Sequence, residues 1–419
     1  MRFSGFDDEW KKSNLGNISS NEMYGMNSAA KDYDGFNKYI RITDISETSN
    51  KFIPNPLTSP DGDLEDKYKL KKGDIVFART GASTGKTYLY DDNDRNLYFA
   101  GFLIKFHIDN ADPKFIFYNT LKEEYLNWVS VMSVRSGQPG INSNEYKKLP
   151  IILPSLDEQN KISNFLTSID KKIDLLERKH QFYQEFKKFL MQQIFTQKLR
   201  FADDENWVTV TIANIFDNIT DYVAAGSFAD IRKNVTYLKD PDYAQLIRTA
   251  DLKSNFTNGD FVYVDKHAFE YLWRVNLDEP CIVLPNIGNI GEVYYINPKE
   301  LPYSNNALAP NAILLKSNDN IKFKYYLLES PYFKNQLDII NEAGGRGKFN
   351  KTNLKKIKIK VPNNDLEKEK IAKCLSNVDN KLKLFNIQLI EMQEFKKGLL
   401  QQMFVVQLIL SLLQNKKHI

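Results

Sequence analysis

The pentapeptide Gln-Glu-Phe-Lys-Lys occurs twice in this chain of 419 residues, at 184–188 and again, about half a chain length later, at 393–397. The similarity extends along both segments and matches Ile162, Asp170 and Phe195 with Ile371, Asp379 and Phe404. A long duplicated segment indicates two copies of one structural unit in a single polypeptide. A chain built in this way suits a partner or ligand that is itself two-sided.

Both repeated segments are predicted to be long helices. Steps of seven residues meet an apolar or aromatic side chain throughout Ile162–Leu190 and Ile371–Leu399, and a second apolar stripe accompanies each series. Apolar residues at positions a and d of successive heptads specify a coiled-coil seam. His180, Lys187 and Lys396 interrupt the second stripe. We therefore expect an imperfect seam toward the C-terminal part of each segment.

Each segment also carries the features of a helix start. A proline, Pro154 or Pro362, precedes each copy and is followed by acidic residues, which favour a helix N-terminus. A helix over 157–195 would be about 60 Å long at about 1.5 Å per residue. We expect the two helices to pair with each other in antiparallel orientation. The alternative is that each stripe packs only on its own neighbouring module.

The segments that flank the helices differ from them in character. They contain short β-branched and aromatic runs separated by Gly, Asn, Asp and Pro, which indicate strands and turns. The two flanking regions are weakly related, since Trp10 is echoed by Trp207 and Ile40-Arg41 by Ile247-Arg248. Framework positions persist while the residues between them differ. This is the pattern expected of two modules that share a scaffold but recognise different targets.

The predicted fold class is α+β with a pseudo-two-fold internal repeat. Two globular mixed α/β modules, at 1–150 and 201–359, are separated by long helices that form an antiparallel coiled coil. The helices occupy 151–200 and 360–419, and the second ends in an apolar C-terminal tail, Val405–Leu413. The tail is too short and too interrupted to cross a bilayer.

Composition limits the class of protein. The net charge of +4 neither demands nor excludes a polyanionic partner, so any basic surface must be local. The first residues lack the apolar core of a secretory signal. The two cysteines, Cys281 and Cys374, lie in apolar runs and are expected to be buried thiols. These features predict a soluble cytoplasmic protein without a membrane segment.

Catalytic motifs are weak. Gly81–Thr87 resembles a phosphate loop, but three residues instead of four separate its glycines, and a strand-like run follows where a helix is required. A glycine-rich hairpin is the better interpretation, and its Lys86 can meet a phosphate of nucleic acid. The four histidines are scattered, and no Cys or His cluster has metal-ligand spacing. Neither a nucleophile elbow nor the Asn-Pro-Pro-aromatic tetrad of amino-methyltransferases is present.

Binding chemistry is better represented. Two glycine-bearing loops, 134–142 and 344–350, occupy equivalent places in the two halves, and both carry basic side chains and end in Asn. Arg and Lys can address guanine edges, Asn and Gln adenine edges, and any basic group a phosphate. The candidate DNA-contacting residues are Arg41, Arg79, Lys86, Arg135, Gln138, Asn142, Arg248, Asn289, Arg346, Lys348 and Asn350. The alternatives are solvated turns for the loops and pairing with a nearby carboxylate for the isolated cations.

The order of these features resembles a known family. The most telling pieces are Trp10, 39–45, 73–81, 153–162 and 399–404. Together they resemble the specificity subunit of type I restriction-modification systems, over essentially the whole chain. The resemblance implies that each module is a target recognition domain that reads one half of a split double-stranded DNA sequence.

The resemblance also implies partners. The paired helices would act as a spacer and as the dock for two modification subunits, and two restriction subunits would join through that core. S-adenosylmethionine, ATP and Mg would belong to those partners, with no cofactor, metal or catalytic residue in this chain. The apolar tail departs from the repeat, because the first copy continues after Phe195 with polar residues. Because of this tail, the resemblance does not define the docking surface at the C-terminus.

We therefore expect a non-catalytic, sequence-specific DNA-binding subunit. One alternative is a self-sufficient DNA-modifying enzyme or a fragment of one, which would require turnover by this chain alone. Another is a coiled-coil scaffold without a DNA role, which would fail to discriminate any DNA sequence.

If the helices act as a ruler, one heptad inserted within 157–195 will change the number of base pairs between the two half-sites of the DNA motif. Both half-sites will keep their sequences, because the modules are untouched. Methylome sequencing of cells that carry the insertion measures the spacing. An unchanged spacing would show that the helices do not set it.

Overall fold

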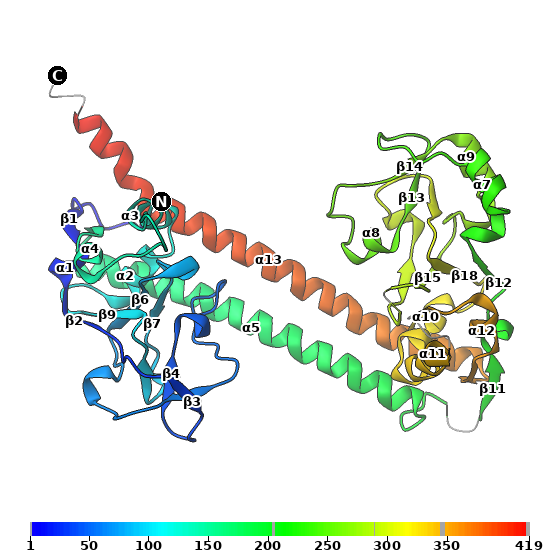
Figure 1. Ribbon diagram of the computed structural model, residues 1–419, viewed down its shortest axis with the longest axis horizontal. Coiled ribbons are helices and arrows are strands. Elements are labelled where there is room, and N and C mark those ends of the chain that lie inside the picture. The colour runs from blue at the N-terminus through cyan, green and yellow to red at the C-terminus, as the bar shows by residue number, and fades with distance from the viewer. Residues whose placement is uncertain (1, 203–205, 289, 344–347, 416–419) are drawn as a thin grey trace. The chain divides into compact units, whose positions relative to one another are not determined.

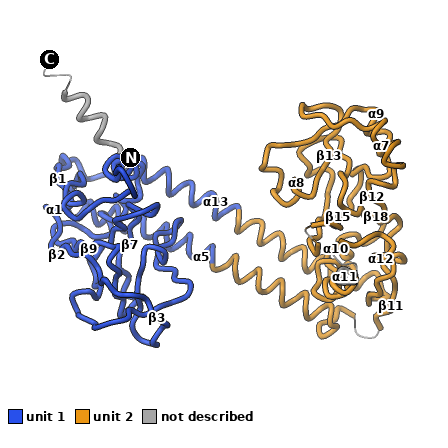
Figure 2. The backbone as a smooth tube through the Cα atoms, in the orientation of Figure 1, with its two compact units in different colours: residues 1–177, 387–419 blue, residues 178–386 orange. Residues whose placement is uncertain are grey.

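The computed structural model describes residues 2–202, 206–288, 290–343 and 348–415. It divides into two compact units (Figure 2), one of residues 1–177 and 387–419 and one of residues 178–386. We call them unit 1 and unit 2. Each unit contains one module and part of each long helix, so both copies of the repeat contribute to both units.

Unit 1 contains module 1, which is built mainly from short strands (Figure 1). The strands are β1 (Lys11–Asn14), β2 (Ser19–Tyr24), β3 (Ala30–Asp32), β4 (Lys38–Ile40), β5 (Thr58–Pro60), β6 (Asp74–Ala78), β7 (Thr87–Leu89), β8 (Leu97–Phe99), β9 (Leu103–Ile108) and β10 (Pro150–Leu153). The helices are α1 (Leu15–Ile18), α2 (Pro113–Asn119), α3 (Glu123–Met132) and α4 (Ser143–Tyr146), and the long α5 (Leu156–Phe195) follows.

Unit 2 contains module 2, with an element order that follows that of module 1. The strands are β11 (Trp207–Thr211), β12 (Asn218–Asp221), β13 (Ala244–Ile247), β14 (Tyr263–Val264), β15 (Cys281–Pro285), β16 (Tyr294–Ile296), β17 (Asn306–Leu308), β18 (Ala312–Lys316) and β19 (Lys358–Pro362). The helices are α6 (Ile212–Ile215), α7 (Phe228–Asn234), α8 (Thr249–Lys253), α9 (Lys266–Tyr271), α10 (Ile321–Glu329), α11 (Pro331–Ala343) and α12 (Lys351–Lys356), and the long α13 (Asp365–Asn415) follows.

The main sheets of the two modules have the same topology. Four antiparallel strands run in the order β2-β9-β6-β7 in module 1 and β12-β18-β15-β16 in module 2. A parallel pair, β4 with β8 or β13 with β17, accompanies each sheet. All five residues of β6 and all five of β15 are buried, which explains their continuous apolar character in the sequence. The predicted internal repeat is thus confirmed for the main sheet and for the parallel pair beside it.

Each module is closed by its first and last strands. β1 pairs antiparallel with β10, and β11 pairs in the same way with β19. The closing strand ends immediately before the long helix begins, at Leu156 or Asp365. Near each helix start one buried glutamate is held by an arginine: Arg2 Nε lies 2.8 Å from Glu158 Oε1, and Arg200 Nε 2.8 Å from Glu367 Oε1.

The long helices pack in antiparallel orientation. In unit 1 the start of α5, including Ile162 and Leu166, shares a core with Leu399 and Met403 of α13. In unit 2 the end of α5 shares a core with the start of α13 around Ile371. Both cores also contain residues of the adjacent module. The predicted pairing is confirmed, and each stripe packs on its own module as well.

The lysines that interrupt the apolar stripe form ion pairs between the copies. Lys187 Nζ lies 2.8 Å from Asp379 Oδ1 in unit 2, and Lys396 Nζ lies 2.6 Å from Asp170 Oδ1 in unit 1. The two aspartates are equivalent in the repeat, and so are the two lysines. The aspartate of each copy is therefore neutralised by the pentapeptide of the other copy. A partly buried ion pair of this kind fixes helix register, because a shifted register leaves both charges unpaired.

A tyrosine of the module completes each pair. Tyr326 donates its hydroxyl to Asp379 Oδ2 at 2.6 Å, and Tyr118 donates to Asp170 Oδ2 at 2.7 Å. Burial, together with the nearby carboxylate, raises the pKa of both tyrosines, so they stay protonated as donors. Burial alone would lower the pKa of Lys187, but the carboxylates of Glu329 and Asp379 outweigh it and raise that pKa.

The remaining expectations concern thiols and membranes. Cys281 and Cys374 are free, and burial raises the pKa of the Cys281 thiol to about 12, which makes it unreactive.

Among the described residues no helix combines the length and apolar character needed to cross a bilayer. The side chains of the predicted apolar tail, Val405–Leu413, lie outside the described residues.

Replacing Lys187 by methionine should lower the free energy of unfolding by about 2 kcal/mol, because Asp379 is left partly buried without its cation. Lys188→Met is the matched control, since Lys188 is an exposed member of the same pentapeptide. Its cost should be below about 0.5 kcal/mol. Urea denaturation followed by circular dichroism measures both. Equal effects of the two substitutions would contradict a register role for Lys187.

Candidate nucleic-acid interface

In module 1 the two loops that carry candidate residues form one surface. The hairpin that joins β6 to β7 starts with a short 3-10 turn, Gly81–Ser83, which confirms the hairpin interpretation of this glycine-rich segment. Thr80 forms a β-bridge with Gly140 of the loop 134–142, and Gly81 N donates to Pro139 O at 2.9 Å. We call this arrangement the paired loops of module 1.

Module 2 has paired loops at the same place. Ile287, which follows β15, forms a β-bridge with Lys348, and Phe349 N donates to Asn286 O at 3.2 Å. The side chain of Lys348 is exposed here, and its contact with DNA stays a prediction. The candidates Asn289 and Arg346 lie outside the described residues.

Arg79 is the candidate with the most defined setting. Its guanidinium carbon lies 5.1 Å from the centroid of the Tyr24 ring and 5.8 Å from that of Phe102, and Nε donates to Gly101 O at 3.0 Å. The two aromatic side chains are 42% and 56% exposed, so the cation sits between two rings at the surface. Cation–π contacts orient a guanidinium while they leave its outer N–H groups available for a ligand.

The candidates on the loop 134–142 have internal partners. Arg135 Nη2 lies 2.6 Å from each carboxylate oxygen of Glu145, and Asn142 caps α4 by accepting from Glu145 N at 3.0 Å. Asn350 caps α12 in the same way, accepting from Asn353 N at 2.8 Å. The recurring Asn at the end of each loop is therefore explained by helix capping.

Gln138 and Lys86 occupy contrasting positions. Gln138 is exposed, and its amide lies against Gly81, where a Cβ would come within 2.9 Å of Gln138 Nε2. The Lys86 side chain is only 9% exposed, and Nζ donates to Ile45 O and to the carboxylate of Glu47. In this structure Lys86 therefore ties two loops of module 1 together. Its contact with a phosphate stays a prediction.

Arg41 and Arg248 occupy equivalent places in the two modules and make the same contacts. Arg41 Nη2 lies 2.9 Å from Asp44 Oδ1, and Arg248 Nη2 lies 2.7 Å from Asp251 Oδ1. Each aspartate is 1% exposed and also accepts the backbone N–H of its arginine. The hydrogen-bonded carboxylate raises the pKa of both arginines. Both therefore secure a turn of the framework, the alternative that the sequence had left open.

Sequence reasoning missed a basic edge in module 2. Lys355 and Lys356 end α12, and Lys358 and Lys360 alternate with buried residues on β19; all four side chains are exposed. The alternation of lysine with Ile359 was a visible signal of a strand with one charged face. Tyr24 and Phe102 were also missed, because they lie far from Arg79 in the sequence.

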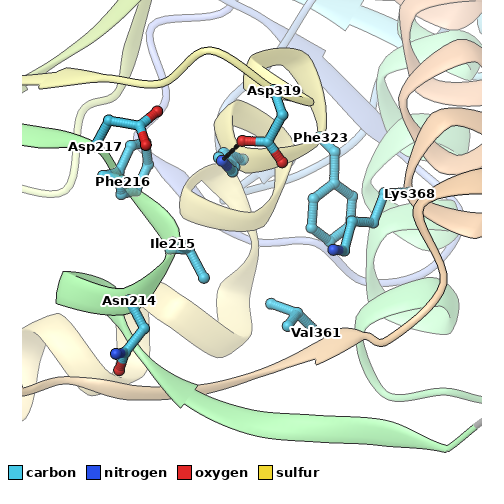
Figure 3. A pocket seen from close by; sticks show the side chains of 9 residues that line it. Asn214, Ile215, Phe216, Asp217, Asp319, Phe323, Val361 and Lys368 are labelled. Atoms are coloured by element: carbon cyan, nitrogen blue, oxygen red, sulfur yellow. Dashed lines mark hydrogen bonds and ion pairs between the residues drawn. The ribbon is translucent and has the colours of Figure 1, made fainter.

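A small polar cavity of about 170 Å³ lies elsewhere in unit 2 (Figure 3). Asp217, Asp319, Lys324 and Lys368 line it, and Lys324 Nζ lies 2.6 Å from Asp319 Oδ1. Burial alone would raise the pKa of Asp319, but the hydrogen bond from Lys324 outweighs it and lowers that pKa. The charges of the cavity are thus internally balanced. Within the described ranges no group of three His, Cys, Asp or Glu residues is placed to hold a metal ion.

Comparison with known proteins identifies the family. Residues 7–181 and 204–392 match the model of the type I restriction modification DNA specificity domain. The two matched segments cover most of the chain and correspond to the two copies of the repeat. The chain belongs to this family.

Two curated relatives are specificity subunits. The chain is 26% identical over 193 residues to the HindI specificity subunit of Haemophilus influenzae, an alignment that covers 45% of this chain and 41% of that protein. It is 23% identical over 356 residues to the putative MjaX specificity subunit of Methanocaldococcus jannaschii, covering 80% of this chain and 78% of that protein.

Solved structures share the fold. The type I restriction-modification system S subunit from M. genitalium superposes with a TM-score of 0.59 at 16% identity over 95% of this chain and 96% of that one. A chain from a study of assembly and conformational transition in the type I R-M system gives a TM-score of 0.51 at 14% identity, over 96% and 98% of the two chains. The fold predicted from the resemblance is confirmed.

Arg41→Ala should lower the free energy of unfolding by about 1–3 kcal/mol, because it leaves the buried carboxylate of Asp44 without its cation. DNA sequence preference should stay unchanged. Denaturant unfolding and selection from a random DNA library measure the two effects. A changed preference with unchanged stability would show that Arg41 contacts DNA instead.

Proposed function

We propose that this chain selects the DNA sequence for a type I restriction-modification complex, and that each module reads one half of a bipartite target. The observation that carries the proposal is the recurrence of the paired loops. Both modules hold two loops together by the same backbone contacts, yet the side chains at the loops differ. A constant frame with variable side chains is what reading two different half-sites requires.

Surface chemistry supports a nucleic-acid partner. Arg79 in module 1 and Lys348 in module 2 stand on the paired loops, and the exposed lysines of α12 and β19 add positive charge to module 2. Cations neutralise phosphates and release counterions, which supplies affinity regardless of sequence. Guanidinium groups aimed at base edges supply sequence discrimination.

In this proposal the chain supplies recognition and its partners supply the chemistry. Two modification subunits would bring S-adenosylmethionine, and two restriction subunits would bring ATP-driven translocation with Mg. The chain itself would hold none of these groups. The duplicated architecture favours pairs of partners, because two equivalent surfaces bind two equivalent subunits.

The long helices carry exposed apolar side chains that suit such docking. In unit 2 Phe182, Phe186 and Phe189 of α5 are 60%, 37% and 55% exposed. In unit 1 Ile390 and Phe395 of α13 are 53% and 52% exposed. Apolar side chains gathered on a solvent-facing helix surface mark an interaction site. Phe186 and Phe395 are equivalent members of the repeated pentapeptide, so each unit presents one copy of the proposed dock.

Deletion of the gene should abolish methylation at one split DNA motif and leave all other motifs unchanged. Methylome sequencing of the deletion strain and of its complemented derivative measures this directly. Complementation with the wild-type gene serves as the control and should restore the motif. An unchanged methylome in a strain that expresses the modification subunit would refute the proposal. Methylation of DNA by the purified chain in the absence of partners would instead favour a self-sufficient enzyme.

A further inference from the structure

Arg79 of module 1 and Asn286 of module 2 occupy the same place in the repeat. Ala78 pairs with Leu103 at the end of β6, and Pro285 pairs with Ala312 at the end of β15. Arg79 and Asn286 are the next residues along these two strands. The equivalence follows from strand register and is independent of any sequence similarity.

The backbone hydrogen bonds of the two positions agree. Arg79 N donates to Phe102 O at 3.0 Å, and Asn286 N donates to Asn311 O at 3.1 Å. The carbonyl of each residue accepts from the second of the paired loops: Ile141 N lies 2.9 Å from Arg79 O, and the equivalent contact from Phe349 N to Asn286 O is 3.2 Å. The same backbone frame therefore presents an arginine in one module and an asparagine in the other.

The neighbouring side chains differ in a coordinated way. Tyr24 pairs with Ile104 as Asp221 pairs with Ile313, so Asp221 stands where module 1 has Tyr24. Asn311 likewise stands where module 1 has Phe102. In module 1 the two rings hold the guanidinium of Arg79 between them. In module 2 short polar side chains take the places of all three.

The result in module 2 is a cavity of about 590 Å³. Its lining includes Asp221, Asn286 and Asn311, with aromatic walls from Tyr222, Phe228 and Tyr237. Phe228 and Tyr237 are 73% and 53% exposed, which places them where the cavity meets solvent. A volume between about 300 and 1,000 Å³ with apolar walls and a small number of polar groups is typical of sites that bind a small molecule.

Asn286, one of the residues that line the cavity, carries an unsatisfied hydrogen-bond acceptor. Asn286 Nδ2 donates to Phe349 O at 3.2 Å, which orients the amide. Asn286 Oδ1 is buried and has no hydrogen-bond partner among the described residues. Asp221 also lines the cavity, and its Oδ1 accepts from Lys351 Nζ at 2.8 Å. These two groups are acceptors and suit a ligand that donates, and Arg232, which lines the same cavity, adds a donor.

We propose that these equivalent positions determine which base each half-site contains, and that the module 2 cavity receives the edge of a base with an exocyclic amino group. Adenine N6 and cytosine N4 are the amino donors that DNA presents in its major groove, whereas Arg79 suits the O6 and N7 acceptors of guanine. The inference rests on the proposed function. It deepens that function by naming one discriminating residue in each module.

The test is selection from a random duplex library by the full chain bound to its modification subunit. Asn286→Arg should lower discrimination at one position of the module 2 half-site by about 10-fold. The module 1 half-site should stay unchanged. Arg79→Asn should have the reciprocal effect. Asn380→Arg adds the same charge at an exposed position of α13 in unit 2 and should leave the motif unaltered.

If Asn286→Arg does not fold, as judged by circular dichroism, Asn286→Ser removes the amide without added bulk and gives the same readout. Base analogues test the hydrogen bond itself, with purine in place of adenine or 2-pyrimidinone in place of cytosine. The wild-type chain should bind the matching analogue about 10-fold more weakly, whereas Asn286→Ser should bind both DNAs equally.

One outcome would overturn the inference alone: a split motif that survives both loop substitutions. A wild-type complex that selects no split motif would instead refute the proposed function, and the inference with it. The two failures are therefore distinguishable in one experiment.

Discussion

The ion pairs between Lys187 and Asp379 and between Lys396 and Asp170 are the contacts on which the rest of the architecture depends. Each joins the two copies of the repeat, so neither copy satisfies its own charges. The apolar seam alone would tolerate a shift by one heptad, because its residues are chemically similar. The ion pairs remove that freedom, since only one register brings each lysine to an aspartate and its tyrosine.

The sequence predicted the helices and the central strands because periodicity records which faces are buried. It also predicted the repeat, including the lysines that break the stripe. It could not show that those lysines cross to the other copy, because their partners are far away along the chain. The capping roles of Asn142 and Asn350 were easier to predict from the sequence. Each Asn side chain accepts from the backbone N–H three residues later, so the signal is local. A loop that looks chemically active can owe its polar ends to the short helix that follows it.

The arginines also show that the sequence reveals partners that are near in the chain but not those that are far away. Arg41 and Arg248 have a carboxylate three residues later, which already suggested an internal role. Arg79 has no such neighbour, and its setting depends on Tyr24 and Phe102, which approach it only when β2, β6 and β9 assemble. The module frame is thus carried by backbone hydrogen bonds that every residue except proline can make. Side chains at the loop ends are free to differ between modules without loss of the fold.

The pairing of β1 with β10, and of β11 with β19, places the entrance and the exit of each module side by side. A module inserted through one such strand pair does not disturb the chain on either side of it. Each module thus has a single joint with the rest of the chain. An exchange of the segment between the two strands of that joint would replace one module and keep the other, without redesign of either long helix.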